Sequence, residues 1–388
     1  MNSSQNTSKE RLEPDHFQLG IPIDSNRLDR PQPLTTEPSA RAQLVRFVRV
    51  KGLILSGGAG TRMRPLTHSM AKQLLPIANQ PILHRAVSRL VEVGIEDVLV
   101  IVGDTEKQVM ESLGDGSNLH ARVSYLRQEA PLGLAHCVKI ARDWLGDSSF
   151  VVYLGDNVFE AGLQTLMNDY ANAPHNSPRV AQVAVKQVDN PSSFGVASID
   201  DEACLTEVVE KPDNPPTNLA LVGTYLFTPI IHDAIERILP SSRGELEITD
   251  AIQQLINDGH KVGVSEVHGW WYDAGNPAAF LECNAAVLLQ EGSKDFRTLV
   301  GVSLIPPYVI HPTAQLTNCK VGPNASIGPE VILEGINVSD SVLLRGAVVQ
   351  GSGQLVGSII GERSKLTISH GARITTIIGD DCIVGVEP

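Results

Sequence analysis

Between residues 51 and about 290, short apolar runs alternate with segments in which apolar residues recur at helical spacing. The short runs are rich in aliphatic residues and predict buried strands at 52–55, 97–102, 150–154 and 180–185. Strands that alternate with helices favour an α/β fold, in which a mostly parallel sheet is covered by helices on both faces. Ligands of such folds bind at the carboxyl ends of the strands.

Three of the segments between the runs carry clear helical signals. The first is opened by Asn79-Gln80-Pro81 and stops near Gly94, and its apolar face comprises Ile82, Ala86, Leu90 and Val93. Thr228 and Pro229 have the N-cap and first-turn arrangement that opens a second helix. The third has Ala251, Ile252, Leu255 and Ile256 on its apolar face and ends near Gly259.

From about residue 300 the helical periodicity disappears, and short units of an aliphatic residue followed by Gly or a polar residue replace it. Val321, Ile327 and Leu333 are six residues apart, and Ile310 and Leu316 form a second six-spaced pair. A hexapeptide period is typical of a parallel β-helix, in which each aliphatic residue fills a narrow interior. The six-residue spacing slips by one residue between Leu316 and Val321, and it becomes irregular after Val338. An irregular β-domain therefore remains the alternative.

The first 47 residues are polar, with scattered Pro, Ser, Thr and Asn, and they predict a disordered extension. A targeting peptide is one alternative, although several acidic residues and the lack of an apolar core argue against it. A second alternative is that the segment is not natively translated, with Val48 or Val50 as the first residue. The chain is thus expected to comprise an extension at 1–47, an α/β domain at 48–292 and a β-helix at 300–388.

Composition narrows the function classes. Apolar residues make up 42% of the chain and charged residues 19%, which fits a soluble α/β protein. The net charge of -13 argues against nucleic acid as a partner, because binding a phosphate backbone needs a basic face. No apolar run approaches the roughly 20 residues that span a bilayer, so no membrane partner is expected. Five dispersed cysteines without a CxxC pair indicate neither a disulfide framework nor a zinc site, and suit a cytoplasmic location.

The turn after the first strand, in the stretch LILSGGAGTRMRPLT, fits neither of two common nucleotide-binding motifs. A dinucleotide fingerprint requires a glycine three residues after Gly60, where the chain has Met63. A Walker A loop requires a glycine five residues after Gly57, where the chain has Arg62.

What remains is a glycine turn followed by basic residues, of which Arg62 and Lys72 are the candidates for binding a ligand. Gly57, Gly58 and Gly60 expose backbone N–H groups that can line an anion. Arg62 adds a bidentate charged donor, and Lys72 in the run AKQLLP adds a point charge. This combination favours a polyphosphate ligand over a tight turn with solvated arginines.

At this point the chain resembles a known family. LSGGAGTRMRPLT followed by AKQLLP resembles the signature of the sugar-1-phosphate nucleotidylyltransferases, and QEAPLGLA resembles the base-recognition loop of the glucose-1-phosphate thymidylyltransferases. LGDN, RGELEITD and WYDAGN follow in the family's order, so that the resemblance covers about residues 51–290. It implies a Rossmann-like, mostly parallel nucleotidyltransferase domain followed, as in the longer members, by a left-handed parallel β-helix.

The resemblance also implies an activity and a set of site residues. The activity is Mg²⁺-dependent transfer from dTTP to glucose 1-phosphate, giving dTDP-glucose and pyrophosphate. The implied catalytic residues are Arg62, Lys72 and Asp156, and the implied metal ligands are Asp156 and Asp273. The implied nucleotide-binding residues are Leu55, Gly57, Gly58, Gly60, Thr61, Gln128 and Gly133. The implied sugar-phosphate residues are Gly195, Glu210, Lys211, Gly223 and Arg243.

The chemistry of the residues agrees with this implied set. Asp156 and Asp273 each follow an apolar strand-like run, so both can reach one sheet edge and hold a magnesium ion. Taken singly, each is equally a solvated loop residue, or an N-cap for the helix near Asn276. One departure concerns Phe194, which stands where many relatives have tyrosine, so a hydrogen bond from that hydroxyl does not carry over.

Several alternatives stay open. The enzyme could use UTP or another sugar 1-phosphate, or be a catalytically inactive regulatory subunit. His311 and His370 in the tail would suit a second, acetyltransferase activity. Trp270 and Trp271 are interpreted as packing residues and His136 as structural. The tail is expected to serve assembly into a homo-oligomer, with a trimer favoured, and to supply no catalytic groups.

Overall fold

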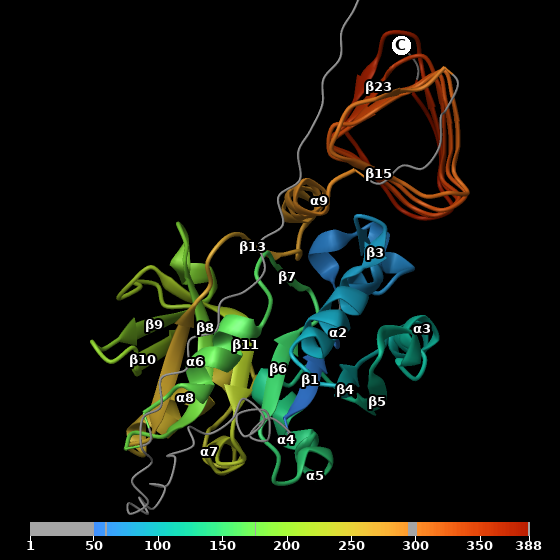
Figure 1. Cartoon of the computed structure of the whole chain (residues 1–388). Helices are drawn as coiled ribbons and strands as arrows, with labels where there is room; N and C mark the ends of the chain where they lie inside the picture. Colours follow the sequence, from blue (N-terminus) through green and yellow to red (C-terminus); the bar gives the residue numbers. More distant parts are fainter. Residues whose placement is uncertain (1–49, 59, 175, 294–300, 387–388) are drawn as a thin grey trace, which may run out of the picture. The chain divides into compact units, whose positions relative to one another are not determined.

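The computed structural model describes residues 50–58, 60–174, 176–293 and 301–386 (Figure 1). The predicted extension at 1–47 lies outside the described residues. A nine-stranded sheet has the order β10-β9-β11-β6-β1-β4-β5, with β8 beside β11 and β12 beside β8. Its strands are β1 (Lys51–Leu55), β4 (Asp97–Val102), β5 (Arg122–Arg127), β6 (Phe150–Leu154), β8 (Arg179–Gln187), β9 (Gly195–Ile199), β10 (Leu205–Glu210), β11 (Leu219–Phe227) and β12 (Lys261–Glu266).

The half of the sheet around β1 is parallel, as the sequence predicts. β1 lies between β4 and β6, and β5 extends the parallel set beyond β4. The other half is mixed, because β11 runs antiparallel to β6, β8 and β9, whereas β12 runs parallel to β8. The predicted strands at 97–102 and 150–154 coincide with β4 and β6, and those at 52–55 and 180–185 lie within β1 and β8.

Helices cover both faces of this sheet. One face carries α2 (Ile82–Glu92), α3 (Glu106–Leu113) and α6 (Gln164–Ala171), and the other carries α4 (Leu134–Ile140), α5 (Arg142–Leu145), α7 (Ile231–Ile235) and α8 (Ile248–Asn257). Alternate residues of β1 supply the two cores: Leu53 and Leu55 pack on the α4 side, and Ile54 packs on the α2 side. The predicted two-sided α/β architecture is therefore confirmed.

Residues 301–386 form a coil of three five-stranded parallel sheets with a triangular cross-section, as Figure 1 shows. The first sheet comprises β14 (Ser303–Leu304), β17 (Lys320–Val321), β20 (Asn337–Ser339), β23 (Gln354–Val356) and β26 (Arg373–Ile374). The second comprises β15 (Tyr308–Ile310), β18 (Ala325–Ile327), β21 (Val342–Leu343), β24 (Ile359–Ile360) and β27 (Ile377–Ile378). The third comprises β16 (Gln315–Thr317), β19 (Ile332–Glu334), β22 (Val348–Gly351), β25 (Lys365–Ile368) and β28 (Ile383–Val386). This is the architecture of a left-handed β-helix.

The interior of the coil explains both the hexapeptide period and its slip. Val321, Ile327 and Leu333 are completely buried, one on each sheet. Val321 pairs with Leu304 in the turn before it and with Val338 in the turn after it, each 17 residues away. A turn of 17 residues holds two steps of six and one of five, because one corner is a residue shorter.

The β-helix and the α/β domain share an apolar core. The long helix α9 (Pro277–Glu291) and the two-stranded sheets β2 (Pro76–Ile77)–β3 (Gln80–Pro81) and β7 (Asn157–Phe159)–β13 (Trp271–Asp273) lie in this region. One buried cluster joins Met63 and Leu66 to Phe280 of α9 and to Val342 and Ile359 of the β-helix. The sequence did not predict this shared core.

Asn284 of α9 reinforces the junction with hydrogen bonds. Its Oδ1 accepts from Ser326 Oγ of the β-helix at 2.7 Å and from the Ala78 N–H at 2.9 Å. A fully buried polar side chain with partners on both sides fixes how the two surfaces meet.

In the described part of the chain, no helix is long and apolar enough to cross a bilayer.

Candidate active site

The glycine turn leaves the carboxyl end of β1 and lies against the neighbouring strand ends. The Ser56 N–H donates to the Ile101 carbonyl at 2.9 Å, which continues the pairing of β1 with β4. Gly60 adopts a left-handed conformation with φ of 60°, which favours glycine, and its carbonyl accepts from Thr67 Oγ1 at 2.7 Å. This hydrogen bond folds the chain back on itself, so that Arg62 and Lys72 follow the turn on a compact segment. We call residues 61–75 the signature segment.

Lys72 lies between the two predicted metal ligands. Its Nζ donates to Asp156 Oδ2 at 2.5 Å and lies 3.6 Å from Asp273 Oδ1. Antiparallel pairing of β13 with β7 sets Asp273 opposite Asn157, which brings the two aspartates together although they are far apart in the sequence. Arg62 Nη2 lies 3.6 Å from Asp273 Oδ2, with a side chain that is 66% exposed. The N-cap of α9 is Asn276, not Asp273, because Asn276 Oδ1 accepts from the Ala279 N–H.

The two carboxyl groups have opposite pKa shifts. Burial acts to raise the pKa of Asp156, but the Lys72 ammonium and hydrogen bonds from Lys72 and Asn157 outweigh burial, so the pKa is lowered. Burial, followed by the negative charge of Asp156, raises the pKa of Asp273 despite Lys72 and Arg62. Two close carboxylates therefore need additional positive charge to be ionised together.

This donor set fits a magnesium ion. Asp273 Oδ1 is buried and has no hydrogen-bond partner among the described residues, so it can serve as a metal ligand. Mg²⁺ in nucleotide sites is commonly held by one or two carboxylates together with substrate phosphates, rather than by an all-protein cage. Accordingly, nowhere in the described ranges do three or more His, Cys, Asp or Glu side chains gather into a metal-binding group.

Gln128 follows β5 and faces the glycine turn. Its Nε2 donates to the Gly133 carbonyl at 3.2 Å and contacts His136 Nδ1 at 3.0 Å. A β-carbon at Gly57 would lie 3.5 Å from Gln128 Oε1, so the amide oxygen points toward the turn. Gly133 has φ of 99°, and a β-carbon there would lie only 2.3 Å from the Leu246 carbonyl, so only glycine fits.

His136 lies beside Gln128, and its pKa is shifted. Burial, and then the nearby Lys139 charge, lowers the pKa of His136 and favours the neutral imidazole. A neutral ring can present an unprotonated Nδ1 as an acceptor, which uses the second amide hydrogen of Gln128. The interpretation of His136 as structural therefore agrees with this contact.

A cavity of about 340 Å³ is lined in part by Asp273, one of the two aspartates. Of the residues predicted from the sequence, it is lined by Arg62, Phe194, Gly195, Glu210, Lys211, Gly223 and Asp273. Arg243 lies beside it, with Nη2 at 2.8 Å from Glu247 Oε1 and 3.1 Å from Glu210 Oε1. Lys211 Nζ is 3.2 Å from the same Glu210 oxygen, so one carboxylate holds both cations.

The cavity also contains residues that sequence reasoning missed. Trp271, interpreted as a packing residue, lines the cavity; its ring packs edge-on against Phe194 at 5.4 Å, and its Nε1 donates to Asn157 Oδ1 at 2.7 Å. Its position two residues before Asp273 on the same strand was the available signal, because such residues share a face. The other missed lining residues are Leu134, Leu154, Asn157, Ser193, Leu221, Tyr225, Glu247, Ile248 and Thr249.

Comparison with known proteins assigns the family. The nucleotidyl transferase family profile matches residues 51–290, and the GMPPB C-terminal domain profile matches residues 304–387. The chain therefore belongs to the nucleotidyl transferase family and is an enzyme. More specifically, it is a sugar-1-phosphate nucleotidyltransferase, as the sequence resemblance implied.

Individual relatives match most of the chain. The low-salt glycan biosynthesis nucleotidyltransferase Agl11 of Haloferax volcanii is 40% identical over 82% of this chain and 94% of its own length. A glucose-1-phosphate thymidylyltransferase of Streptomyces griseus is 40% identical over 85% of this chain and 98% of its own. The crystal structure of a UDP-glucose pyrophosphorylase complexed with UDP-glucose covers 62% of this chain and 99% of its own, with 25% identity and a TM-score of 0.55.

Proposed function

We propose that the enzyme joins dTTP and glucose 1-phosphate into dTDP-glucose and pyrophosphate, with Mg²⁺ as its cofactor. The observation that carries this proposal is the Lys72–Asp156–Asp273 cluster, which adjoins the cavity lined by the predicted sugar-phosphate residues. Leu134, next to Gly133 of the base loop, lines the same cavity. Groups suited to a base, a polyphosphate and a sugar phosphate thus lie side by side.

The orientation of Gln128 supports a base of the thymine or uracil type. With both amide hydrogens directed at Gly133 and His136, the amide oxygen is left as an acceptor. Thymine and uracil present a donor at N3–H, whereas cytosine presents an unprotonated nitrogen there. Cytosine would place acceptor against acceptor, so CTP is expected to be a poor substrate.

The reaction needs no nucleophile from the protein. A phosphate oxygen of the sugar phosphate attacks the α-phosphorus of dTTP; the new P–O bond forms as the bond to pyrophosphate breaks. Arg62 and Lys72 would stabilise the negative charge that develops on the triphosphate. Asp156 and Asp273 would hold Mg²⁺, which when bound neutralises phosphate charge. Lys211 and Arg243, next to the cavity, would bind the sugar phosphate.

UTP is the second candidate nucleotide. Thymine differs from uracil by one methyl group, and burying it is worth only about 1 kcal/mol. Gln128 Oε1 would accept from the N3–H equally in both bases. The relative that binds UDP-glucose supports this alternative, although the thymidylyltransferase of Streptomyces griseus is more similar in sequence.

The test is pyrophosphate release measured over a matrix of dTTP, UTP, CTP, ATP and GTP against glucose, mannose, galactose and N-acetylglucosamine 1-phosphates. We expect the highest kcat/KM for dTTP with glucose 1-phosphate, UTP next, and no turnover after Mg²⁺ is chelated. Higher kcat/KM for another pair would overturn the substrate assignment, and full activity in excess chelator would overturn the metal assignment. Parallel reactions with acetyl-CoA and an amino-sugar phosphate test the acetyltransferase alternative.

A further inference from the structure

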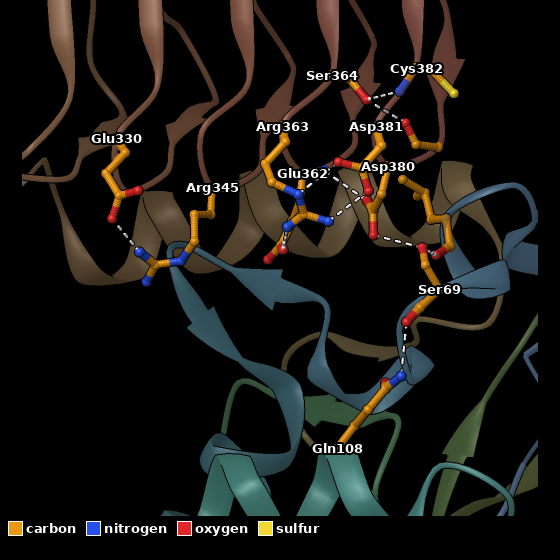
Figure 2. Close-up of polar contacts among 12 residues, drawn as sticks. Ser69, Gln108, Glu330, Arg345, Glu362, Arg363, Ser364, Asp380, Asp381 and Cys382 are labelled. Atoms are coloured by element: carbon orange, nitrogen blue, oxygen red, sulfur yellow. Dashed lines mark hydrogen bonds and ion pairs between the residues drawn. The ribbon is translucent and has the colours of Figure 1, made fainter.

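The last turn of the β-helix touches the signature segment. Asp380 lies between β27 and β28, and its Oδ2 accepts a hydrogen bond from Ser69 Oγ at 2.6 Å (Figure 2). Gly379 next to it lies against Pro65, where an added β-carbon would stand 3.2 Å from the proline Cβ. Residues separated by 311 positions in the sequence are thus in direct contact.

Asp380 is itself firmly held. Its Oδ1 accepts from the Glu362 N–H at 2.7 Å, in the preceding turn of the coil. A carboxylate fixed through one oxygen can present the other in a defined direction, and hydrogen bonds to a charged group are stronger than neutral ones. The β-helix therefore presents a rigid acceptor to Ser69.

Ser69 is held from the opposite side by the α/β domain. Gln108 of α3 donates through Nε2 to the Ser69 carbonyl at 2.8 Å, as Figure 2 shows. Its Oε1 accepts from the Ala71 N–H at 2.7 Å. The chain from Ser69 to Ala71 is thus clamped between α3 and the β-helix, and the next residue is Lys72.

The apolar cluster beneath the signature segment also includes residues of the β-helix. Met63 and Leu66 are completely buried in the cluster that includes Val342, Leu344 and Ile359. Met63 directly follows Arg62, so the backbone that carries the guanidinium rests on this cluster. Arg62 is therefore adjacent to a residue of the shared cluster, and Lys72 lies three residues after Ser69, which the β-helix contacts.

We propose that the β-helix is a positioning element of the active site, and that Asp380 acts through Ser69 to hold the signature segment so that Arg62 and Lys72 meet the triphosphate. Asp380 is a positioning residue and touches no substrate. The proposal rests on the proposed nucleotidyl transfer, and it gives the tail a role beyond the assembly expected from its sequence.

Asp380→Ala, made in the full-length chain, removes the contact, and two further variants serve as controls. Asp380→Asn keeps a hydrogen bond to Ser69 but reverses its direction. An amide N–H can donate to Ser69 Oγ while the amide oxygen still accepts from the Glu362 N–H. Asp381→Asn is the matched control at the neighbouring position: Asp381 pairs with Arg363 within the β-helix, and asparagine tolerates its φ of 57° (Figure 2).

Three measurements distinguish positioning from a merely structural role: kcat and KM separately, Tm, and hydrogen–deuterium exchange of peptides covering residues 61–75. For Asp380→Ala we expect kcat to fall about tenfold with KM for both substrates within about twofold, because positioning acts on the transition state more than on ground-state binding. Exchange should accelerate in the signature segment. Asp380→Asn should recover most of the kcat, and Asp381→Asn should match the wild type in kcat and exchange.

The proposal is overturned if Asp380→Ala keeps wild-type kcat and exchange, or if Asp381→Asn lowers kcat as much. Ser69→Ala removes the same hydrogen bond from the other side, so it keeps the test decisive if Asp380→Ala misfolds; combined with Asp380→Ala, it should cause little additional loss. Exchange needs no substrate. If exchange is faster in Asp380→Ala but the wild type transfers no nucleotide at all, the proposed function is overturned. The contact between Asp380 and the signature segment would still be supported.

Discussion

At the scale of single residues, the site is organised around a buried lysine. Lys72 is 6% exposed, and its charge is balanced by Asp156 at 2.5 Å and Asp273 at 3.6 Å. Removing one partner of a buried ion pair costs stability, because the other charge is left uncompensated. The two aspartates are expected to differ in this respect, because only Asp156 makes the short contact.

Asp156→Asn and Asp273→Asn should each lower kcat by about a hundredfold or more, since each removes a carboxylate that we assign to Mg²⁺ and several kcal/mol of charge stabilisation depend on the metal. Asp156→Asn should also lower Tm more than Asp273→Asn does. Initial rates over a Mg²⁺ titration, together with thermal unfolding, check both points. Wild-type activity of either variant in saturating Mg²⁺ would refute its role as a ligand.

Arg62→Ala should lower kcat by about tenfold or more while changing KM for the sugar phosphate less, because the charge it meets develops during transfer. Tm should stay unchanged, because the side chain is 66% exposed and its contact with Asp273 is long. Arg62→Lys keeps the positive charge but not the bidentate guanidinium, so its kcat should lie between those of the wild type and Arg62→Ala. A change confined to KM would instead identify Arg62 as a ground-state binding residue.

The residues that the sequence located well are those next to strand ends. Arg62 and Asp156 come after β1 and β6, which are parallel neighbours, so the fold class indicated that they would lie at one edge. Asp273 reaches Asp156 through the antiparallel pairing of β13 with β7, which the fold class did not indicate. Trp271 was missed because a large apolar residue in a short strand gives the same pattern whether it packs or lines a cavity. The Ser69–Asp380 contact could not be predicted from the sequence. Each residue lies in a polar turn whose local sequence gives no indication of the other turn.

At the scale of elements, strands with uniform apolar runs were predictable and interrupted ones were not. β4 and β6 were located to the residue, whereas β11 was not predicted. Its sequence LALVGTYLF contains Gly223, where the register with β8 shifts between Leu221 and Tyr225. A bulge breaks the alternation on which strand prediction depends. In the β-helix, the 17-residue turn had the same blurring effect on the six-residue period.

Helix α7 buries a histidine that should make stability depend on pH. Neither ring nitrogen of His232 has a hydrogen-bond partner among the described residues, and the ring stacks on Phe150 at 5.8 Å. Burial, and then Arg142, lowers the pKa of His232 below 6.5, although Asp233 and Glu236 act in the opposite direction. In the unfolded chain His232 therefore binds a proton near pH 6.5, whereas in the folded protein it stays neutral at that pH.

The sign follows from this difference. The contribution of His232 to stability is fully present above pH 6.5 and is lost as the pH falls through the lower folded-state pKa, at up to about 1.4 kcal/mol per pH unit. His232→Leu, which has a similar volume and no proton to bind, should lose less stability between pH 7 and pH 5 than the wild type. Urea unfolding at several pH values measures this, and parallel curves for the two proteins would contradict it.

At the scale of the whole molecule, the α/β domain and the β-helix behave as cooperating parts. The predicted boundary between 292 and 300 remains a prediction; what the structure adds is the shared apolar cluster and the Asn284 hydrogen bonds. Sequence periodicity could not predict this junction. The six-residue period reports only the residues that face the interior of the coil. It is the same whether the outer face of the second sheet packs against another domain or faces solvent.

The shared core bears on what truncation after Gln290 would do. Such a chain lacks Val342, Leu344 and Ile359, and therefore uncovers part of the apolar cluster to which Met63 and Leu66 belong. Several uncovered apolar side chains, at about 1.5–3 kcal/mol for each one fully exposed, amount to several kcal/mol. A loss of that size would lower Tm by roughly 10 °C or more.

We therefore expect the truncated chain to melt earlier and to lose more kcat than Asp380→Ala, since it loses part of the apolar cluster beneath the signature segment as well as the Ser69 contact. Light scattering of both proteins tests the separate prediction that the β-helix mediates assembly, with a trimer favoured, because truncation should then lower the molar mass to that of a monomer. Assembly and positioning are separable: Asp380→Ala should keep the full-length oligomer while losing kcat. A truncated monomer with wild-type kcat would show that the β-helix serves assembly alone.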